Sequence, residues 1–357
     1  MPADPDDLCS ALETIGDGRH LTREACRAAV ARIVDGQASE AALAAFLAGL
    51  RVKGETDAEL AGAVDAVRSR MTPFEPPRRP VLDTCGTGGD GSSSLNVSTA
   101  TAIVSAASGA IVAKHGNRSA SGVSGSSDVL ERLGVAIDPG PELLADCLDE
   151  LGLAFFFAPR FHPALKHAAA VRKQLPFRTL FNLVGPLANP ARPDYQLVGV
   201  PDRRLALLMA AALSRLGVTR AAVVTGPEGL DEVGLSGPTE VLWVESGRIE
   251  PASWTPEQFG LPPVRAEQLR VCSPEQSAAL IREVLDGQNG PARHVILANS
   301  AAALMVAGLA DDPSSGVKRA AEAIDSGKAR ALLDRWARFS LGSSGPRAST
   351  NPSPPRP

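Results

Sequence analysis

The chain has 357 residues, of which 44% are hydrophobic and 21% charged, and its formal net charge is −4. This composition supplies enough apolar surface for one large or two modest domains and excludes disorder over most of the length. The acidic balance argues against a nucleic-acid or anionic-membrane partner. No apolar run reaches the ~20 residues that a membrane span needs, and the N-terminal residues lack the apolar core of a signal peptide.

The five cysteines are widely spaced along the chain. Their spacing predicts neither a disulfide framework nor a paired metal motif, so we expect a reducing, cytoplasmic setting.

The first 76 residues have the spacing of a small helical domain. Thr22, Ser39 and Thr56 are placed to cap three successive helices, the last within a capping-box pattern. These segments carry no reactive motif. We therefore expect residues 1–76 to bury their apolar faces by packing against part of 165–195 and by forming a dimer contact.

The chain then changes to an α/β pattern, with a proline-rich hinge followed by a larger domain that we place over residues 77–339. Short apolar runs alternate with helical stretches, which predicts a central, largely parallel sheet. The expected strands are 81–84, 110–113, 154–157, 196–200, 221–225, 241–245 and 294–298, and the expected helices include 99–107, 142–151, 203–216 and 301–309. Residues 340–357 have almost nothing to bury, so we expect a disordered tail.

The strongest local signal is a glycine-rich loop within residues 83–99, between an expected strand and an expected helix. Gly86, Gly88 and Gly91 match a dinucleotide-binding pattern, yet residues 106–118 contain no acidic residue for a ribose, and a P-loop lysine is absent. Glycines let successive backbone N–H groups converge on anionic oxygens, and the following helix start adds free N–H groups. The loop therefore predicts a phosphate or pyrophosphate site instead of an NAD or P-loop ATP site.

A second polar loop, residues 114–128, follows the next expected strand. Lys114 would supply a point charge and Arg118 a planar fork to an anion, among glycines and serines that add further donors. Ligands of open α/β sheets bind beyond the C-terminal ends of the strands, so we expect both loops at one edge. The adjacent carboxylates of Asp231 and Glu232 follow a later strand and suit Mg²⁺, which combines one or two carboxylates with substrate phosphates.

Five motifs in this order resemble the anthranilate phosphoribosyltransferase family. The resemblance implies a helical domain hinged to an α/β domain of the nucleoside phosphorylase/phosphoribosyltransferase type. It also implies that phosphoribosyl pyrophosphate (PRPP) and Mg²⁺ bind between the domains of a homodimer. The implied reaction transfers the phosphoribosyl group to the amine of anthranilate, in tryptophan biosynthesis. The motifs are GTGGD (86–90), NVST (96–99), KHGNR (114–118), FNLVGPL (181–187) and GLDE (229–232), and the similarity runs from about residue 21 to residue 336.

The resemblance also implies which residues form the site. Lys114, Asn117 and Arg172 would be catalytic, and anthranilate would contact Gly86, Asn117 and Arg172. Ser98, Asp231 and Glu232 would hold the metal. The implied PRPP ligands are Gly86, Gly89, Asp90, Ser94, Asn96, Val97, Ser98, Thr99, Lys114, His115, Gly116, Asn117, Arg118, Ser119, Ala120, Ser121, Gly122 and Ser126.

The implied chemistry fits the residues that are present. The aromatic amine of anthranilate is neutral and already nucleophilic, so no strong general base is required. Catalysis would come from Mg²⁺ and cations that stabilise the departing pyrophosphate, and from alignment of the amine.

Three alternatives to this function stay open or are disfavoured. The chain has Val123, Leu95 and Thr225 where the family often has a polar residue, an aromatic residue and a histidine, so a paralogue acting on another aromatic acid stays open. A pyrimidine nucleoside phosphorylase would have a different signature loop and no use for the pair Asp231 and Glu232. A nucleic-acid-binding relative should be basic, and this chain is acidic.

Two further stretches have simpler interpretations. Residues 162–190 carry cations that suit an acidic co-substrate, but we expect Lys166, Lys173 and Arg178 to lie on a solvated basic face. Residues 311–316 superficially resemble the acidic loop of the common phosphoribosyltransferase class. They follow a helical stretch instead of a strand, so we expect a turn that ends a helix.

Overall fold

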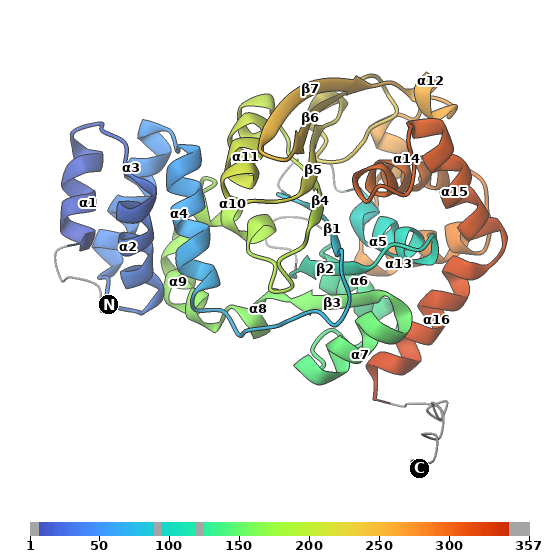
Figure 1. Ribbon diagram of the computed structural model, residues 1–357, viewed down its shortest axis with the longest axis horizontal. Helices are drawn as coiled ribbons and strands as arrows, with labels where there is room; N and C mark the ends of the chain where they lie inside the picture. Colours follow the sequence, from blue (N-terminus) through green and yellow to red (C-terminus); the bar gives the residue numbers. More distant parts are fainter. Residues whose placement is uncertain (1–6, 89–93, 119–123, 343–357) are drawn as a thin grey trace, which may run out of the picture.

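A computed structural model of the chain describes residues 7–88, 94–118 and 124–342 (Figure 1). Within these ranges seven strands form one sheet: β1 (Leu82–Gly86), β2 (Val112–Gly116), β3 (Leu153–Phe157), β4 (Tyr195–Gly199), β5 (Arg220–Thr225), β6 (Thr239–Glu245) and β7 (Arg248–Trp254). The α-helices described are α1 (Asp7–Gly16), α2 (Arg23–Val34), α3 (Glu40–Lys53), α4 (Asp57–Arg68), α5 (Val97–Ala107), α6 (Ser126–Arg132), α7 (Pro141–Leu151), α8 (Ala158–Phe161), α9 (Lys166–Gln174), α10 (Leu180–Leu187), α11 (Arg203–Arg215), α12 (Pro256–Phe259), α13 (Pro274–Leu285), α14 (Pro291–Val306), α15 (Pro313–Asp325) and α16 (Lys328–Ser340). Short 3-10 helices are η1 (Pro163–Leu165), η2 (Pro227–Gly229) and η3 (Ala266–Leu269).

The N-terminal helices form a bundle whose starts are set by side-chain caps. Thr22 and Ser39 accept hydrogen bonds from the backbone of the first turns of α2 and α3, and Thr56 begins α4 with a complete capping box. Helices α2 and α4 pack closely against each other. A Cβ added to Gly62 of α4 would lie only 2.2 Å from the carbonyl oxygen of Arg23 in α2, so glycine is needed there. The predicted helical region is confirmed, and α1 is an additional helix that the caps did not reveal.

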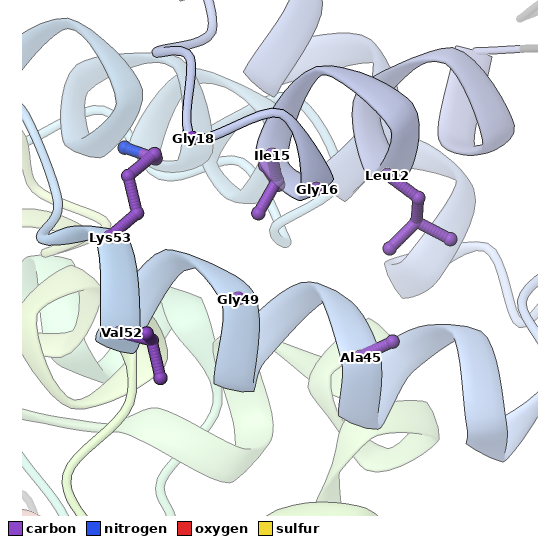
Figure 2. Close-up of a pocket in the computed structure, with 8 residues that line it drawn as sticks. All are labelled: Leu12, Ile15, Gly16, Gly18, Ala45, Gly49, Val52 and Lys53. Carbon is purple, nitrogen blue, oxygen red and sulfur yellow. The ribbon is translucent and has the colours of Figure 1, made fainter.

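The bundle carries an apolar groove between α1 and α3 (Figure 2). Leu12 and Ile15 line it from α1, and Val52 lines it from α3. The groove has a volume of about 440 Å³, and Val52 is 89% exposed. This face of the bundle therefore has an apolar surface that the described residues of the chain leave uncovered.

The central sheet has the strand order β3-β2-β1-β4-β5-β6-β7. Strands β1 to β5 pair in parallel, whereas β6 and β7 add an antiparallel hairpin at one edge. The predicted fold class, a helical domain followed by an α/β domain with a largely parallel sheet, is confirmed. Strand β7 is an addition to the expected set, because its side chains are mostly exposed and give no apolar run.

Each face of the sheet packs into a different apolar cluster. The side chains of β5, which alternate between the two faces, show this. Ala222 and Val224 point toward the cluster that contains α5 and α14, while Ala221 and Val223 point toward α11 and the helical bundle. Helices α9 and α10 belong to the second cluster and contact α2, α3 and α4 (Figure 1). The guanidinium of Arg68 on α4 adds two hydrogen bonds to the Leu187 carbonyl oxygen, so the bundle is tied to the end of α10.

Two sequence-based expectations about the C-terminal part are wrong. The strand expected at 294–298 is helical and lies within α14, whose last part contains most of the helix expected at 301–309. Helix α14 is buried along nearly its whole length, so its sequence has no polar face, and an apolar run of this kind cannot be told from a strand by periodicity. Asp312, expected in a turn that ends a helix, instead caps α15 by accepting from the Ser315 amide.

The expected C-terminal tail begins inside the fold. Ser340 is the last residue of α16, and its buried hydroxyl accepts a hydrogen bond from the Ala136 amide. Residues 343–357 lie outside the described residues. None of the described helices is both long and apolar enough to span a bilayer.

Candidate active site

The two predicted loops leave the sheet side by side, at the C-terminal ends of the parallel strands β1 and β2. Asn96 caps α5 by accepting from the Thr99 amide, and its side-chain amide donates to the Ser124 carbonyl oxygen of the second loop at 2.9 Å. Val97 and Ser98 complete the first turn of α5, while Ser94 forms an isolated bridge with Arg270. The structure therefore brings both loops and one helix N-terminus to a single edge.

Several predicted PRPP ligands lie outside the described residues, so their part in the site stays a prediction. They are Gly89, Asp90, Ser119, Ala120, Ser121 and Gly122. Val123, the departure from the family pattern in the second loop, is also outside.

Asp231, in the acidic turn after β5, contacts the glycine loop. One of its carboxylate oxygens accepts from the Gly88 amide at 2.7 Å, and a Cβ on Gly86 would lie 2.5 Å from the same oxygen. Only glycine at residue 86 permits this approach. The acidic turn after β5 and the glycine loop are therefore in direct contact, although 143 positions of sequence separate Gly88 from Asp231.

The oxygen atoms of Ser98, Asp231 and Glu232 are of the kind that suits a hard cation. Ser98 Oγ accepts from Lys114 Nζ at 3.0 Å, and the carboxylate of Glu232 favours the charged form of the same lysine. Within the described residues no group of three His, Cys, Asp or Glu side chains could hold a metal alone. Two carboxylates and a hydroxyl match Mg²⁺, which keeps coordination positions for water and phosphate oxygens. The residues present thus fit Mg²⁺ bound together with a phosphorylated ligand.

Lys114 lies beneath the loops and is only 2% exposed. Its ammonium donates to the Thr84 carbonyl oxygen at 2.7 Å as well as to Ser98. Burial lowers the pKa of Lys114, which Asp83 partly offsets by its negative charge, and burial raises the pKa of Asp83 to about 6. Asn189 donates to Asp83 at 2.8 Å. This geometry makes Lys114 a holder of Ser98, and direct contact of the lysine with substrate stays a prediction.

Arg118 has a different environment from the one the sequence suggested. Its guanidinium forms ion pairs with Asp128 and Glu131 of α6 at 2.7 and 2.8 Å, and these carboxylates raise its pKa. Asn117 accepts from the Arg118 amide at 2.7 Å, and its carbonyl oxygen accepts from the Ser126 hydroxyl. The fork of Arg118 is therefore engaged by protein carboxylates, and phosphate binding by it stays a prediction.

Arg172 lies on the last turn of α9, six residues before Arg178. Its guanidinium lies over the Phe181 ring, 5.6 Å from the centroid, and burial lowers its pKa. In the part of the chain that the structure describes, it has no hydrogen-bond or ion-pair partner. A partly desolvated cation without a counter-ion is suited to a carboxylate from outside the protein.

Arg178 is a contact of the glycine loop that the sequence did not reveal. The sequence pattern predicts a solvated basic face for it. In the structure its guanidinium donates to Thr87 Oγ1 at 3.1 Å and to the Gly88 carbonyl oxygen at 2.5 Å. No motif in a single sequence marks this role, because the two partners are about ninety residues away.

His115, a predicted PRPP ligand, is buried at the end of β2. Its ring packs edge-on against His162, with 5.2 Å between centroids. Burial lowers the pKa of His115 well below its usual value, and burial lowers that of His162 to about 4. Both imidazoles are therefore neutral at pH 7, and His115 contributes packing below the second loop.

Comparison with known proteins identifies the class. The helical bundle domain of a glycosyl transferase family matches residues 10–71, and the a/b domain of that family matches residues 78–330. The protein of Thermomicrobium roseum named anthranilate phosphoribosyltransferase is 47% identical over 330 residues, which covers 91% of this chain and 95% of that protein.

Solved structures narrow the class further. The anthranilate phosphoribosyltransferase of Thermus thermophilus has a TM-score of 0.88 and 39% identity, and the match covers 93% of this chain and 99% of that one. The Saccharomyces cerevisiae enzyme in complex with PRPP and Mg has a TM-score of 0.86 and 26% identity, with 94% and 98% covered. The same enzyme was also solved with 4-fluoroanthranilate, with a TM-score of 0.86, 26% identity, and 95% and 99% covered. The chain belongs to the anthranilate phosphoribosyltransferase family.

The buried histidine pair makes the fold acid-sensitive. Unfolded His162 protonates near its usual 6.5, but the folded protein resists protonation until about pH 4, so stability falls as the pH drops through this window. At ~1.4 kcal/mol per pKa unit, the loss from His162 is roughly 3 kcal/mol. Urea unfolding at pH 7 and pH 4.5 should show a smaller pH difference for His162→Gln than for the unsubstituted protein. The exposed His20, changed to Gln, should keep the full difference; an unchanged difference in His162→Gln would contradict this origin.

Proposed function

We propose that the protein transfers the phosphoribosyl group of PRPP to the amine of anthranilate. The products are N-(5-phosphoribosyl)anthranilate and pyrophosphate, in a step of tryptophan biosynthesis. One observation carries the proposal: Arg178, which contacts the glycine loop, follows by six residues Arg172, a half-buried cation that lacks a counter-ion among the described residues. PRPP requires a phosphate cradle, here the glycine loop with the start of α5, and anthranilate requires a separate cation as an anchor for its carboxylate, here Arg172.

The donor half of the reaction belongs to the glycine loop and the start of α5. The free backbone N–H groups and the dipole at the N-terminus of α5 would face the phosphates. Ser98, Asp231 and Glu232 would hold Mg²⁺, which when bound neutralises charge on the pyrophosphate leaving group. Lys114 keeps the Ser98 hydroxyl in place through its hydrogen bond, and Asp83 compensates the buried ammonium.

The acceptor half needs orientation and no proton abstraction before attack. The neutral aromatic amine attacks the anomeric carbon as the bond to pyrophosphate breaks, and it sheds its extra proton afterwards. Arg172 would hold the anthranilate carboxylate bidentately and Asn117 and Gly86 would lie against the substrate, which aligns the amine with the anomeric carbon. Placing this cation apart from the phosphate cradle keeps two anionic substrates from competing for one site.

The first test combines activity and metal. Purified protein should consume anthranilate, seen as loss of its fluorescence, only when PRPP and Mg²⁺ are both present. The double variant Asp231→Ala and Glu232→Ala should lose about 100-fold in kcat, because the metal would lose both carboxylates. The matched pair Asp149→Ala and Glu150→Ala, on the exposed face of α7, should keep the original Mg²⁺ titration. Failure of the unsubstituted protein to consume anthranilate would sink the function, and an unaltered titration in the first double variant would sink the metal site.

The second test concerns Arg172. Charge-assisted hydrogen bonds are worth ~1.5 to 3 kcal/mol, so Arg172→Ala should raise the KM for anthranilate roughly 10- to 150-fold. The KM for PRPP should barely change. Arg172→Lys should recover only part of the loss, because an ammonium lacks the planar fork. Steady-state kinetics with each substrate varied in turn decides the matter, with Lys166→Ala on the exposed side of α9 as the control. Equal rises in both KM values, or no rise, would refute the anchor.

The protein would act as a homodimer in the cytoplasm. Within the described residues all five cysteines are free, as expected in a reducing compartment. The groove between α1 and α3 supplies an apolar surface for a second copy (Figure 2). Val52→Glu would place a charge in the middle of such a contact and should shift the sedimentation coefficient from dimer to monomer. The exposed Leu207→Glu on α11 is the control, and a monomeric unsubstituted protein would contradict the proposal.

A further inference from the structure

Arg178 lies in the short connection between α9 and α10, and its guanidinium reaches the glycine loop. It donates to Thr87 Oγ1 at 3.1 Å and to the Gly88 carbonyl oxygen at 2.5 Å, so both contacts fall on consecutive residues. The planar fork of arginine suits two neighbouring acceptors, which an ammonium could not reach with the same geometry. The contact therefore fixes the direction of this stretch of the loop.

Gly88 is held from both sides of its backbone. Its amide donates to Asp231 at 2.7 Å, while its carbonyl oxygen accepts from Arg178. The residue has a φ of +68°, a conformation that favours glycine. The adjacent Thr87 amide donates to the Gly199 carbonyl oxygen at 2.9 Å. The guanidinium of Arg178 holds the Gly88 carbonyl group toward itself. If this carbonyl instead pointed into the phosphate cradle, it would repel phosphate oxygens.

The other end of the connection leads to the acceptor anchor. Arg178 immediately precedes Thr179, which is buried and begins α10 with a capping box to Asn182. Arg172 is six residues before Arg178, on the last turn of α9. The connection is thus fixed at α10 by the cap and at the glycine loop by the guanidinium, so it cannot shift without breaking one of them.

We propose that Arg178 is a positioning residue that sets the distance between the phosphate cradle and the anthranilate anchor. This inference rests on the proposed function. The guanidinium ties the segment that carries Arg172 to Thr87 and Gly88, and therefore aligns the amine with the anomeric carbon. Misplacement of reacting groups by about 1 Å can cost ~100-fold in rate, so the loss of Arg178 should lower kcat.

A rival role is direct binding of an anion by Arg178. The residue also lines a polar cavity of about 520 Å³ between α3 and α11, together with Arg51, Glu55 and Arg204. A residue that only bound phosphate by its charge would change the KM for PRPP, and lysine would largely replace it. A positioning residue would change kcat, and lysine would replace it poorly.

The experiment compares Arg178→Ala, Arg178→Lys and Thr87→Val in steady-state kinetics with both substrates. We expect Arg178→Ala to lower kcat about 10- to 100-fold, and the KM for anthranilate to change less than about threefold because Arg172 is intact. Arg178→Lys should recover less than half of the loss on a logarithmic scale. Lys173→Ala, which removes an exposed cation of the same segment, should leave kcat unchanged.

A double-mutant cycle provides the second readout. Thr87→Val removes one acceptor of Arg178 at nearly constant volume, so its effect on kcat should be much smaller in the Arg178→Ala background than alone. Additive effects, a change confined to the KM for PRPP, or full rescue by lysine would overturn the proposal. Thermal melting of each variant shows whether it still folds. If Arg178→Ala unfolds, the variants Thr87→Val and Arg178→Lys still test the proposal. An unsubstituted protein that does not consume anthranilate would instead refute the proposed function.

Discussion

The buried ammonium of Lys114 is the constraint on which the arrangement of the site depends. A buried cation without compensation is costly, so its neighbours must be acceptors or anions. The Thr84 carbonyl and the Ser98 hydroxyl accept its hydrogen bonds, and the charges of Asp83 and Glu232 favour its charged form. These groups come from β1, α5 and the acidic turn after β5. One buried charge thereby fixes how three separate segments meet at the edge of the sheet.

A second constraint arises because both substrates of the proposed reaction are anions. Two anions bind side by side only when each has its own cation and the cations are fixed relative to each other. The proposed site would meet the first condition with Arg172, which has no ion-pair or hydrogen-bond partner among the described residues, and with Mg²⁺ held by Ser98, Asp231 and Glu232. The packing of α9 and α10 onto the bundle meets the second (Figure 1). Here the helical domain contributes rigidity to the site, although its own helices carry no reactive motif.

How far the sequence predicts the structure depends on whether the signal is local. Helix caps such as Thr56 and the glycine loop are local patterns with a direct physical meaning, and the structure contains the caps and places the loop at the expected edge. Helix α14 is buried all round, so no local pattern distinguishes it from a strand. Arg118 and Arg178 were assigned by chemical type alone. Their partners depend on how the chain folds: Arg118 pairs with Asp128 and Glu131, and Arg178 contacts Thr87 and Gly88.

The titration behaviour of the site agrees with a mechanism that moves no proton before attack. Burial lowers the pKa of His115, and desolvation raises that of the Cys85 thiol, so both groups are neutral at pH 7. Neither is poised as a base or a nucleophile at that pH. The guanidinium of Arg172, whose pKa burial lowers, stays charged at pH 7. A site that combines neutral buried groups with permanent cations stabilises a leaving anion by the placement of charge. A neutral aromatic amine suits such a site as acceptor, because it needs no general base before it attacks.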